Sequence, residues 1–306
     1  MPKKIVITGA SSKTGEAIFN FLRMETKHEL VLISSNEKLI SNLKDYETYN
    51  YSIDRLKEVR DILIYVKPDV IINTAGMNSI PDCEDDRKAA WSLNVAAAEN
   101  LVKASRIIEA HTILFSSDQI FDGRKGPYIE EDKANPINYF GKTKLAIENI
   151  AMPGNSKCTI IRTNNIFGHT SYGKPNFIID ILDKLNLQTP SVYSQFEYIN
   201  PALTLDIAQA VAKIIDKERT GIYNVGSSDI KSRYEIARII ARIFNHDAEL
   251  IKIPESELKD KNPVQKKYGL VTLKTETDLN VKMSGITDSL VAFKTLLFGK
   301  KVIKLI

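Results

Sequence analysis

Residues 3–15 read KKIVITGASSKTG and combine three signals of an α/β fold. The β-branched run up to Thr8 is typical of a buried strand, and two glycines, at 9 and 15, bracket a short polar loop. An apolar pattern at helical spacing follows from Ala17 to Leu22. A strand that passes through such a turn directly into a helix is the first half of a β-α-β unit. The segment therefore predicts a parallel sheet that starts near the N-terminus.

Further apolar runs alternate with helical stripes through the first half of the chain. The predicted strands are Lys3–Thr8, Glu29–Ser34, Thr48–Tyr51, Val70–Asn73, Thr112–Ser117 and Thr159–Thr163. This alternation predicts a Rossmann-type doubly wound parallel sheet with helices on both faces. From Gly168 onward the alternation is lost, and the predicted helices are Phe177–Leu185, Thr204–Asp216 and Ser232–Phe244. We therefore expect a sheet domain over 1–165 and a smaller mixed α/β lobe over 166–306, with the chain crossing between the two.

The composition indicates a globular protein and excludes several other classes. Of 306 residues, 43% are hydrophobic and 26% are charged, and the net charge is only +4. The 42 basic residues are scattered, which argues against nucleic acid as a partner. Cys83 and Cys158 have no ligand spacing to each other or to the histidines, so we expect neither a disulfide framework nor a metal site. With no signal-peptide core and no run of about 20 apolar residues, a cytoplasmic protein without a membrane span is expected.

The loop after the first strand is a candidate dinucleotide site. A dinucleotide fingerprint needs small residues where the backbone turns and where it approaches the pyrophosphate, and it places the phosphates at a helix N-terminus. The middle position of this fingerprint, usually glycine, holds a serine here. The loop taken alone is a weak signal, but its place after the first strand strengthens it. The candidate cofactor-binding residues in the loop are Gly9, Ser11, Ser12, Lys13, Thr14 and Gly15.

The ends of two further strands add cofactor candidates. The second strand runs into Ser34, Ser35 and Lys38, without the acid that usually meets a free ribose hydroxyl. Together with Lys13, these residues could hold a 2′-phosphate, so NADP(H) is favoured over NAD(H). The alternative is that both lysines are simply solvated. The fourth strand ends in small residues that let a cofactor lie close to the sheet edge, and its candidates are Asn73, Ala75 and Gly76.

Two longer blocks carry a resemblance to a known family. Residues 115–123 read FSSDQIFDG, and residues 135–148 read NPINYFGKTKLAIE. In these blocks the chain resembles the extended short-chain dehydrogenase/reductase superfamily, most closely the dTDP-4-dehydrorhamnose reductases and the regulatory β subunit of methionine adenosyltransferase. The likeness extends to about residue 240. It implies an NAD(P)-binding N-terminal domain and a substrate-binding C-terminal lobe.

The resemblance also implies a set of catalytic residues. Such enzymes use a Ser or Thr to polarise the substrate carbonyl, a Tyr to transfer the proton, and a Lys four residues later to hold the ribose and lower the pKa of the Tyr. Ser117 matches the first position and Lys144 the last, whereas the tyrosine position is Phe140. Tyr139 is adjacent but out of phase on the helix. Asp118, or a water molecule on Ser117, could supply the proton instead.

Two functions from different classes follow from these residues. The first is an NADP(H)-dependent reductase of a nucleotide-linked 4-keto-6-deoxy sugar, with that nucleotide sugar as its partner. The second is a catalytically impaired NADP-binding protein with a regulatory or sensor role, which the phenylalanine at position 140 favours. An epimerase or dehydratase of the same superfamily depends on the same tyrosine and is less favoured. The sequence leaves a homodimer open.

Overall fold

The computed structural model describes residues 1–153, 157–172, 176–259 and 264–298, and its centre is a seven-stranded parallel sheet with the order β3-β2-β1-β4-β5-β6-β9. Between β1 and β4 the order in which successive strands are added to the sheet reverses, and this is the switch point of a doubly wound sheet. The strands are β1 (Lys4–Thr8), β2 (Glu29–Ile33), β3 (Glu47–Tyr49), β4 (Val70–Asn73), β5 (His111–Ser117), β6 (Cys158–Thr163) and β9 (Gly221–Asn224).

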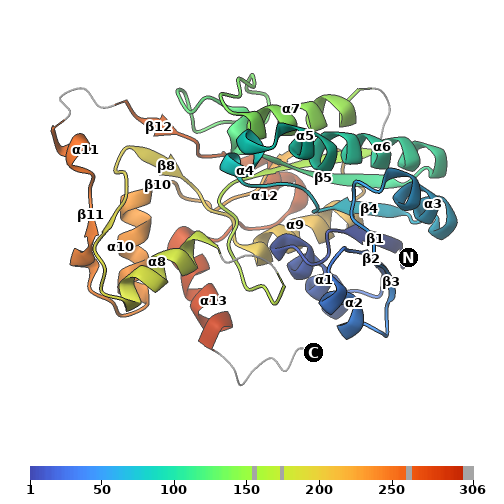
Figure 1. Ribbon diagram of the computed structural model, residues 1–306, viewed down its shortest axis with the longest axis horizontal. Helices are drawn as coiled ribbons and strands as arrows, with labels where there is room; N and C mark the ends of the chain where they lie inside the picture. Colours follow the sequence, from blue (N-terminus) through green and yellow to red (C-terminus); the bar gives the residue numbers. More distant parts are fainter. Residues whose placement is uncertain (154–156, 173–175, 260–263, 299–306) are drawn as a thin grey trace.

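Helices cover both faces of this sheet, as Figure 1 shows. On one face lie α1 (Lys13–Glu25), α2 (Glu37–Asn42), α9 (Thr204–Asp216) and α12 (Leu273–Leu279). On the other face lie α3 (Leu56–Val66), α6 (Ala97–Ile108) and α7 (Tyr139–Ala151). The strands β1, β4 and β6 are almost entirely buried, since both of their faces are covered.

Shorter helical elements follow the carboxyl end of β4. They are α4 (Ile80–Asp85), α5 (Arg87–Ala90) and a π-helical turn (Trp91–Ala96) that runs directly into α6. Asn94 in this turn accepts a hydrogen bond from the amide of Met77 and donates to Thr143 in α7. The loop after β4 is thereby fixed against two helices.

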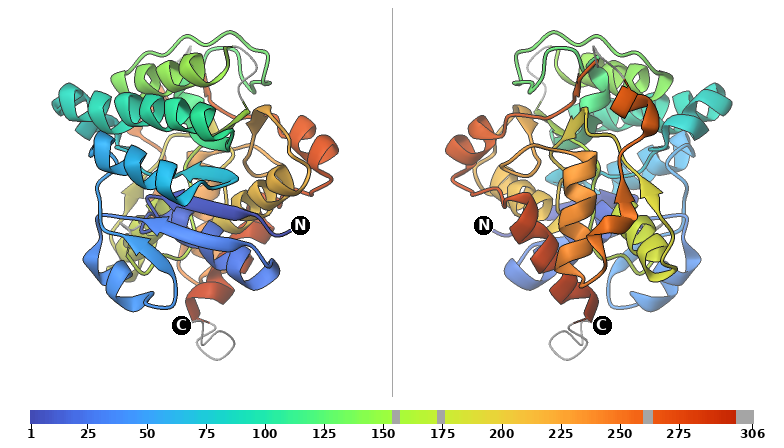
Figure 2. Two further views of the ribbon diagram at one scale, coloured as in Figure 1. Left: turned by 90° about the vertical axis from the view of Figure 1, so that its right-hand side faces the viewer. Right: turned by 90° about the vertical axis from the view of Figure 1, so that its left-hand side faces the viewer.

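A second hydrophobic core lies in the C-terminal part of the chain. It joins α8 (Phe177–Asn186), α10 (Arg233–Ile243) and α13 (Ile286–Phe298), and in the right-hand view of Figure 2 α10 (orange) and α13 (red) face the viewer. The remaining elements are short, namely β7 (Ser191–Val192), β8 (Glu197–Ile199), β10 (Lys231–Ser232), β11 (Ile251–Lys252), α11 (Glu255–Lys259) and β12 (Lys266–Lys267). The strands β10, β8 and β12 form a three-stranded sheet, and β11 and β7 form a two-stranded sheet.

The predicted doubly wound α/β fold is confirmed. All six predicted strands occur within two residues of their predicted ends, and the predicted helix at Thr204–Asp216 has the same bounds as α9. The seventh strand, β9, was not predicted and comes from beyond residue 166, as does α9, so the chain returns to the first sheet after it has entered the C-terminal part. The division at 165/166 stays a prediction. In the described ranges, no helix is both long and apolar enough to span a bilayer.

Candidate functional site

The turn between β1 and α1 requires glycine at positions 9 and 15. Gly9 has a φ of +68°, and a Cβ built there would lie 2.4 Å from the backbone nitrogen of Ala75. A Cβ on Gly15 would lie 2.5 Å from the carbonyl oxygen of Gly9. Both distances are shorter than any real Cβ contact, so the loop packs against the end of β4 only without side chains at these positions.

Ser12, at the middle position of the loop, caps α1. Its hydroxyl accepts a hydrogen bond from the amide of Gly15 and donates one to the hydroxyl of Thr74, each at 3.0 Å. A serine therefore supplies here a contact that a glycine could not make: it satisfies one helix amide and joins the loop to the next strand end.

Two cavities lie along the carboxyl edge of the sheet. The first has a volume of about 650 Å³ and the second about 420 Å³, and they share the lining residues Ser12, Thr74, Ala75, Gly76 and Leu93. They therefore adjoin at the glycine loop, where the strand order reverses. This edge is where doubly wound sheets bind ligands.

The second cavity lies at the ends of β2 and β3. Ser11, Ser34 and Ser35 line it, and the hydroxyl of Ser34 donates to that of Ser11 at 3.0 Å. Within the part of the chain that the structure describes, its lining contains no carboxylate. A ribose with a free 2′-hydroxyl would usually meet an Asp or Glu at this place.

The two candidate lysines lie apart from these serines. Lys13 lines the first cavity, where its Nζ donates to the carbonyl of Ile166 at 3.4 Å and burial lowers its pKa. Lys38 is exposed in the first turn of α2 and lines neither cavity.

The candidates at the end of β4 have different positions. Ala75 and Gly76 line both cavities, and Thr14 lines the first. Asn73 is buried below them and lines neither; its Oδ1 accepts from the Thr8 hydroxyl at 2.7 Å and from the amide of Ala75 at 3.1 Å. Asn73 thus shapes the turn on which Ala75 and Gly76 stand.

Ser117 and Asp118 end β5 at the far side of the first cavity. The Ser117 hydroxyl donates to Oδ1 of Asp118 at 2.8 Å, whereas Oδ2 is buried without a hydrogen-bond partner in the described part of the chain. Burial raises the pKa of Asp118 to about 7, although the hydrogen bond from Ser117 acts in the opposite direction. Near neutral pH this carboxyl group can therefore hold a proton and release it.

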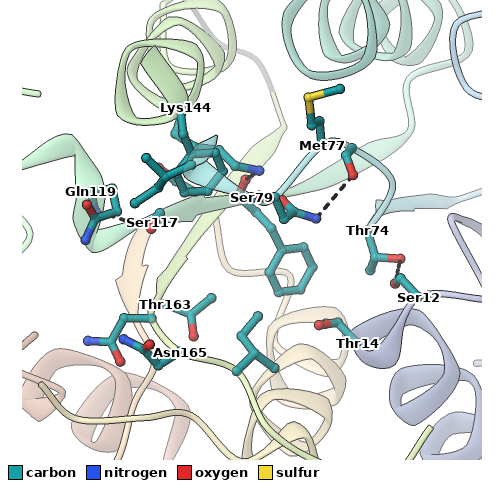
Figure 3. Close-up of a pocket in the computed structure, with 18 of the residues that line it drawn as sticks. Ser12, Thr14, Thr74, Met77, Ser79, Ser117, Gln119, Lys144, Thr163 and Asn165 are labelled. Carbon is teal, nitrogen blue, oxygen red and sulfur yellow. Dashed lines mark hydrogen bonds between the residues drawn. The ribbon is translucent and has the colours of Figure 1, made fainter. Parts of the chain in front are cut away.

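Lys144 enters the same cavity from the second turn of α7, beside Phe140. Its Nζ donates to the carbonyl of Phe115 at 3.2 Å and lies 5.4 Å from the centre of the Phe140 ring. Burial lowers the pKa of Lys144 to about 8. Figure 3 shows Lys144, Ser117 and Gln119 at one end of the cavity, with Ser12 and Thr74 at the other.

Tyr139 does not join this group. It is half-buried at the start of α7, its amide donates to Glu84, and the Arg87 guanidinium lies 5.2 Å from its ring centre. Among the described residues that line the cavity, Phe140 is present and Tyr139 is absent. The structure therefore brings Ser117, Asp118 and Lys144 together and leaves Tyr139 outside.

Several lining residues were not found from the sequence. Arg233 reaches the first cavity from the start of α10, where its Nε donates to Glu197 at 2.6 Å. The capping box of Ser232 and Glu235 marks the beginning of that helix and would have located Arg233, but no local pattern brings it to β5. The segment after β6 contributes Asn164 and Asn165.

Four lining residues carry buried oxygens without a hydrogen-bond partner among the described residues. They are Ser116, Asp118, Thr163 and Asn164. Such orphaned groups are rare in folded proteins and cluster where a polar ligand or water completes the hydrogen bonding. In the same described ranges, no group of three or more His, Cys, Asp or Glu side chains is placed to hold a metal ion.

The family model described as RmlD substrate binding domain matches residues 3–293. The chain belongs to this family. A dTDP-4-dehydrorhamnose reductase of Aggregatibacter actinomycetemcomitans is 28% identical over 241 residues, which are 76% of this chain and 76% of the relative. Methionine adenosyltransferase 2 subunit beta of Bos taurus is 27% identical over 263 residues, which are 84% of this chain and 75% of the relative.

A solved structure of a similar protein has the same fold as this chain. The crystal structure of a dTDP-4-dehydrorhamnose reductase from Clostridium acetobutylicum superposes with a TM-score of 0.81 at 25% identity, over 96% of this chain and 99% of that one. The resemblance predicted from the sequence is thereby confirmed, including both of the protein groups that it named. The relatives named as reductases also confirm the prediction of an oxidoreductase scaffold.

Proposed function

We propose that this protein is an NADP(H)-dependent reductase of a nucleotide-linked 4-keto-6-deoxy sugar, similar to dTDP-4-dehydrorhamnose reductase. The observation that carries the proposal is the convergence of Ser117, Asp118 and Lys144 on one cavity that adjoins the glycine loop. The cavity's buried oxygens that have no hydrogen-bond partner among the described residues suit a ligand rich in hydroxyl groups. Cys83 and Cys158 are both buried and are not joined in a disulfide, as is usual for a protein of the reducing cytoplasm.

The residues present fit a nicotinamide dinucleotide. The phosphates would lie at the N-terminus of α1, in the loop that Gly9 and Gly15 allow to pack closely against the end of β4. The adenosine half would occupy the second cavity, where serines and no carboxylate among the described lining residues favour a 2′-phosphate. We therefore favour NADP(H) over NAD(H), with Ser11, Ser34 and Ser35 as its 2′-phosphate ligands.

The bound cofactor supplies a hydride for the carbonyl carbon of the substrate, and the chain must supply a proton for the carbonyl oxygen. The hydroxyl of Ser117 donates its proton to that oxygen and takes another from Asp118, with which it already shares a hydrogen bond. Asp118 is left as a carboxylate and recovers a proton from solvent. Ser117 and Asp118 thus perform the transfer that the phenylalanine at position 140 cannot perform.

Lys144 has a different role here from that of the matching lysine in enzymes that have a tyrosine at the position of Phe140. Its ammonium group is fixed on the carbonyl of Phe115 and faces the ring of Phe140, so there is no phenol whose pKa it could lower. Its positive charge lies in a low-dielectric cavity and stabilises the negative charge that develops on the substrate oxygen. Lys144 also remains the candidate for holding the nicotinamide ribose.

A second function is favoured by one observation, the buried Phe140 itself. It packs with Cys83 and Ala90 in a small apolar cluster, so the position normally held by the proton donor is part of the hydrophobic core. A chain that binds NADP without turnover would act as a regulatory or sensor protein. This candidate and the reductase differ in catalysis but share the cofactor site.

The test is oxidation of NADPH in the presence of dTDP-4-dehydrorhamnose, followed by absorbance at the nicotinamide band. The unmodified chain should turn over, and Ser117→Ala should lower kcat by about 10²-fold to 10⁴-fold because the proton donor is lost. Ser41→Ala, an exposed serine in α2 that lines neither cavity, is the matched control and should retain full activity. Tight NADPH binding without turnover by the unmodified chain would favour the regulatory candidate.

A further inference from the structure

A short segment after β6 ties the C-terminal part of the chain to the helix that follows the glycine loop. The amide of Ser171 donates to both carboxylate oxygens of Glu16, at 3.1 and 2.8 Å, and the Thr170 hydroxyl donates to one of them at 3.0 Å. Glu16 is buried in the first turn of α1. The segment is therefore anchored within one helical turn of the candidate phosphate site.

The next residue, Tyr172, reaches further along the sheet edge. Its ring is half-buried and packs against the core beneath α1 and α9, and its hydroxyl accepts a hydrogen bond from Asn42 of α2 at 3.1 Å. Tyr172 also lines the second cavity, together with Ser34 and Ser35. Among the described residues that line this cavity, Tyr172 comes from beyond residue 166, and the others come from the first 93 residues.

We propose that Tyr172 is a cofactor-binding residue that closes the adenosine half of the site, and that Glu16 positions it there. This inference rests on the proposed function, since it takes the occupant of the second cavity to be an adenosine ribose phosphate. The apolar face of a tyrosine ring is a surface on which an adenosine can pack, and the ring is held at one end by Asn42 and at the other by its neighbours on Glu16.

The stretch of chain between β6 and Tyr172 also reaches the first cavity, where Ser117 and Lys144 lie. Asn164, Asn165 and Ile166 line the first cavity, and Tyr172 lines the second. One stretch of chain therefore runs beside both halves of a bound dinucleotide. Cofactor affinity is thereby made to depend on a segment outside the βαβ unit that carries the glycine loop.

The test measures binding by isothermal titration calorimetry, with NADPH and with adenosine 2′,5′-bisphosphate, which carries only the adenosine half. Tyr172→Ala should weaken both ligands by about tenfold, because a base loses an aromatic packing surface. Tyr172→Phe keeps the ring and should stay within about twofold of the unmodified chain. Tyr65→Ala removes a tyrosine that is 79% exposed on α3 and outside both cavities, and should change neither affinity.

Three results would overturn the inference, and only one of them also affects the proposed function. Equal NADPH affinity of Tyr172→Ala and the unmodified chain would show that Tyr172 is not a binding residue. A loss for NADPH without a loss for the bisphosphate would show that the ring does not contact the adenosine half. Failure of the unmodified chain to bind NADPH or NADH would reject the inference together with the proposed function.

Discussion

Replacing Asp118 by Asn should change how the stability of the protein depends on pH. The carboxyl group has a pKa of about 7 in the folded chain, because it is buried, and about 3.9 in an unfolded one. Between these two values the unfolded state releases the proton first, so rising pH favours unfolding by about 1.4 kcal/mol per unit. The stability that this group contributes is complete below pH ~4 and is lost as the pH rises to about 7. The loss amounts to about 4 kcal/mol over that interval.

The assay is urea denaturation of the unmodified chain and of Asp118→Asn at several pH values from 4 to 8. Asn keeps the shape of the side chain and an oxygen that can accept from Ser117, but it does not titrate. The stability of the unmodified chain relative to the variant should fall by about 4 kcal/mol across this range. Asp54→Asn, an exposed substitution outside both cavities, is the matched control. Parallel curves for the unmodified chain and Asp118→Asn would refute the assignment of a raised pKa to this carboxyl group.

Two further substitutions test the glycine loop and the buried ion pair. In Gly9→Ala, the residue at position 9 keeps a left-handed backbone conformation, and its Cβ meets the backbone of Ala75. NADPH binding measured by calorimetry should therefore be lost, and the melting temperature should fall. A variant with normal NADPH affinity would contradict the close packing of the loop. Arg162 makes two hydrogen bonds to Glu148, at 2.9 and 2.8 Å, and both side chains are buried. Arg162→Met should lower the free energy of unfolding in urea by about 3–5 kcal/mol because Glu148 is left unpaired, and the double variant with Glu148→Leu should recover much of this. An effect below about 1 kcal/mol for the single variant would contradict a buried pair.

Hydrophobic periodicity predicted the elements that bury a continuous apolar face. The strand Val70–Asn73 and the helix Thr204–Asp216 were located to the residue, since one begins with three consecutive apolar residues and the other has an apolar face at regular helical spacing. The strand β9 was missed because its four residues, GIYN, carry little apolar signal and depend on β6 for their pairing.

The candidate site could be predicted where its residues end a strand or follow a glycine turn. Ser117 and Gly9 belong to this class, because parallel strands deliver their ends to one edge. Arg233 and Tyr172 could not be found in this way, since each reaches the edge through the packing of the C-terminal part against the sheet. The role of Ser12 as the cap of α1 was not predicted, because the dinucleotide fingerprint has glycine at that position and gives no role to a side chain there.

The most direct test of a proton route through Ser117 and Asp118 is the pH profile of kcat for the reduction of dTDP-4-dehydrorhamnose by NADPH. In the unmodified chain kcat should fall about tenfold per pH unit above about 7, because Asp118 must carry a proton. In Asp118→Asn, kcat should be low at every pH and should not show this fall. In Phe140→Tyr, kcat above about pH 7 should be higher than in the unmodified chain, because a phenol is returned beside Lys144. A kcat of the unmodified chain that stays constant to pH 9, or an Asp118→Asn variant as fast as the unmodified chain, would contradict the proposed proton route.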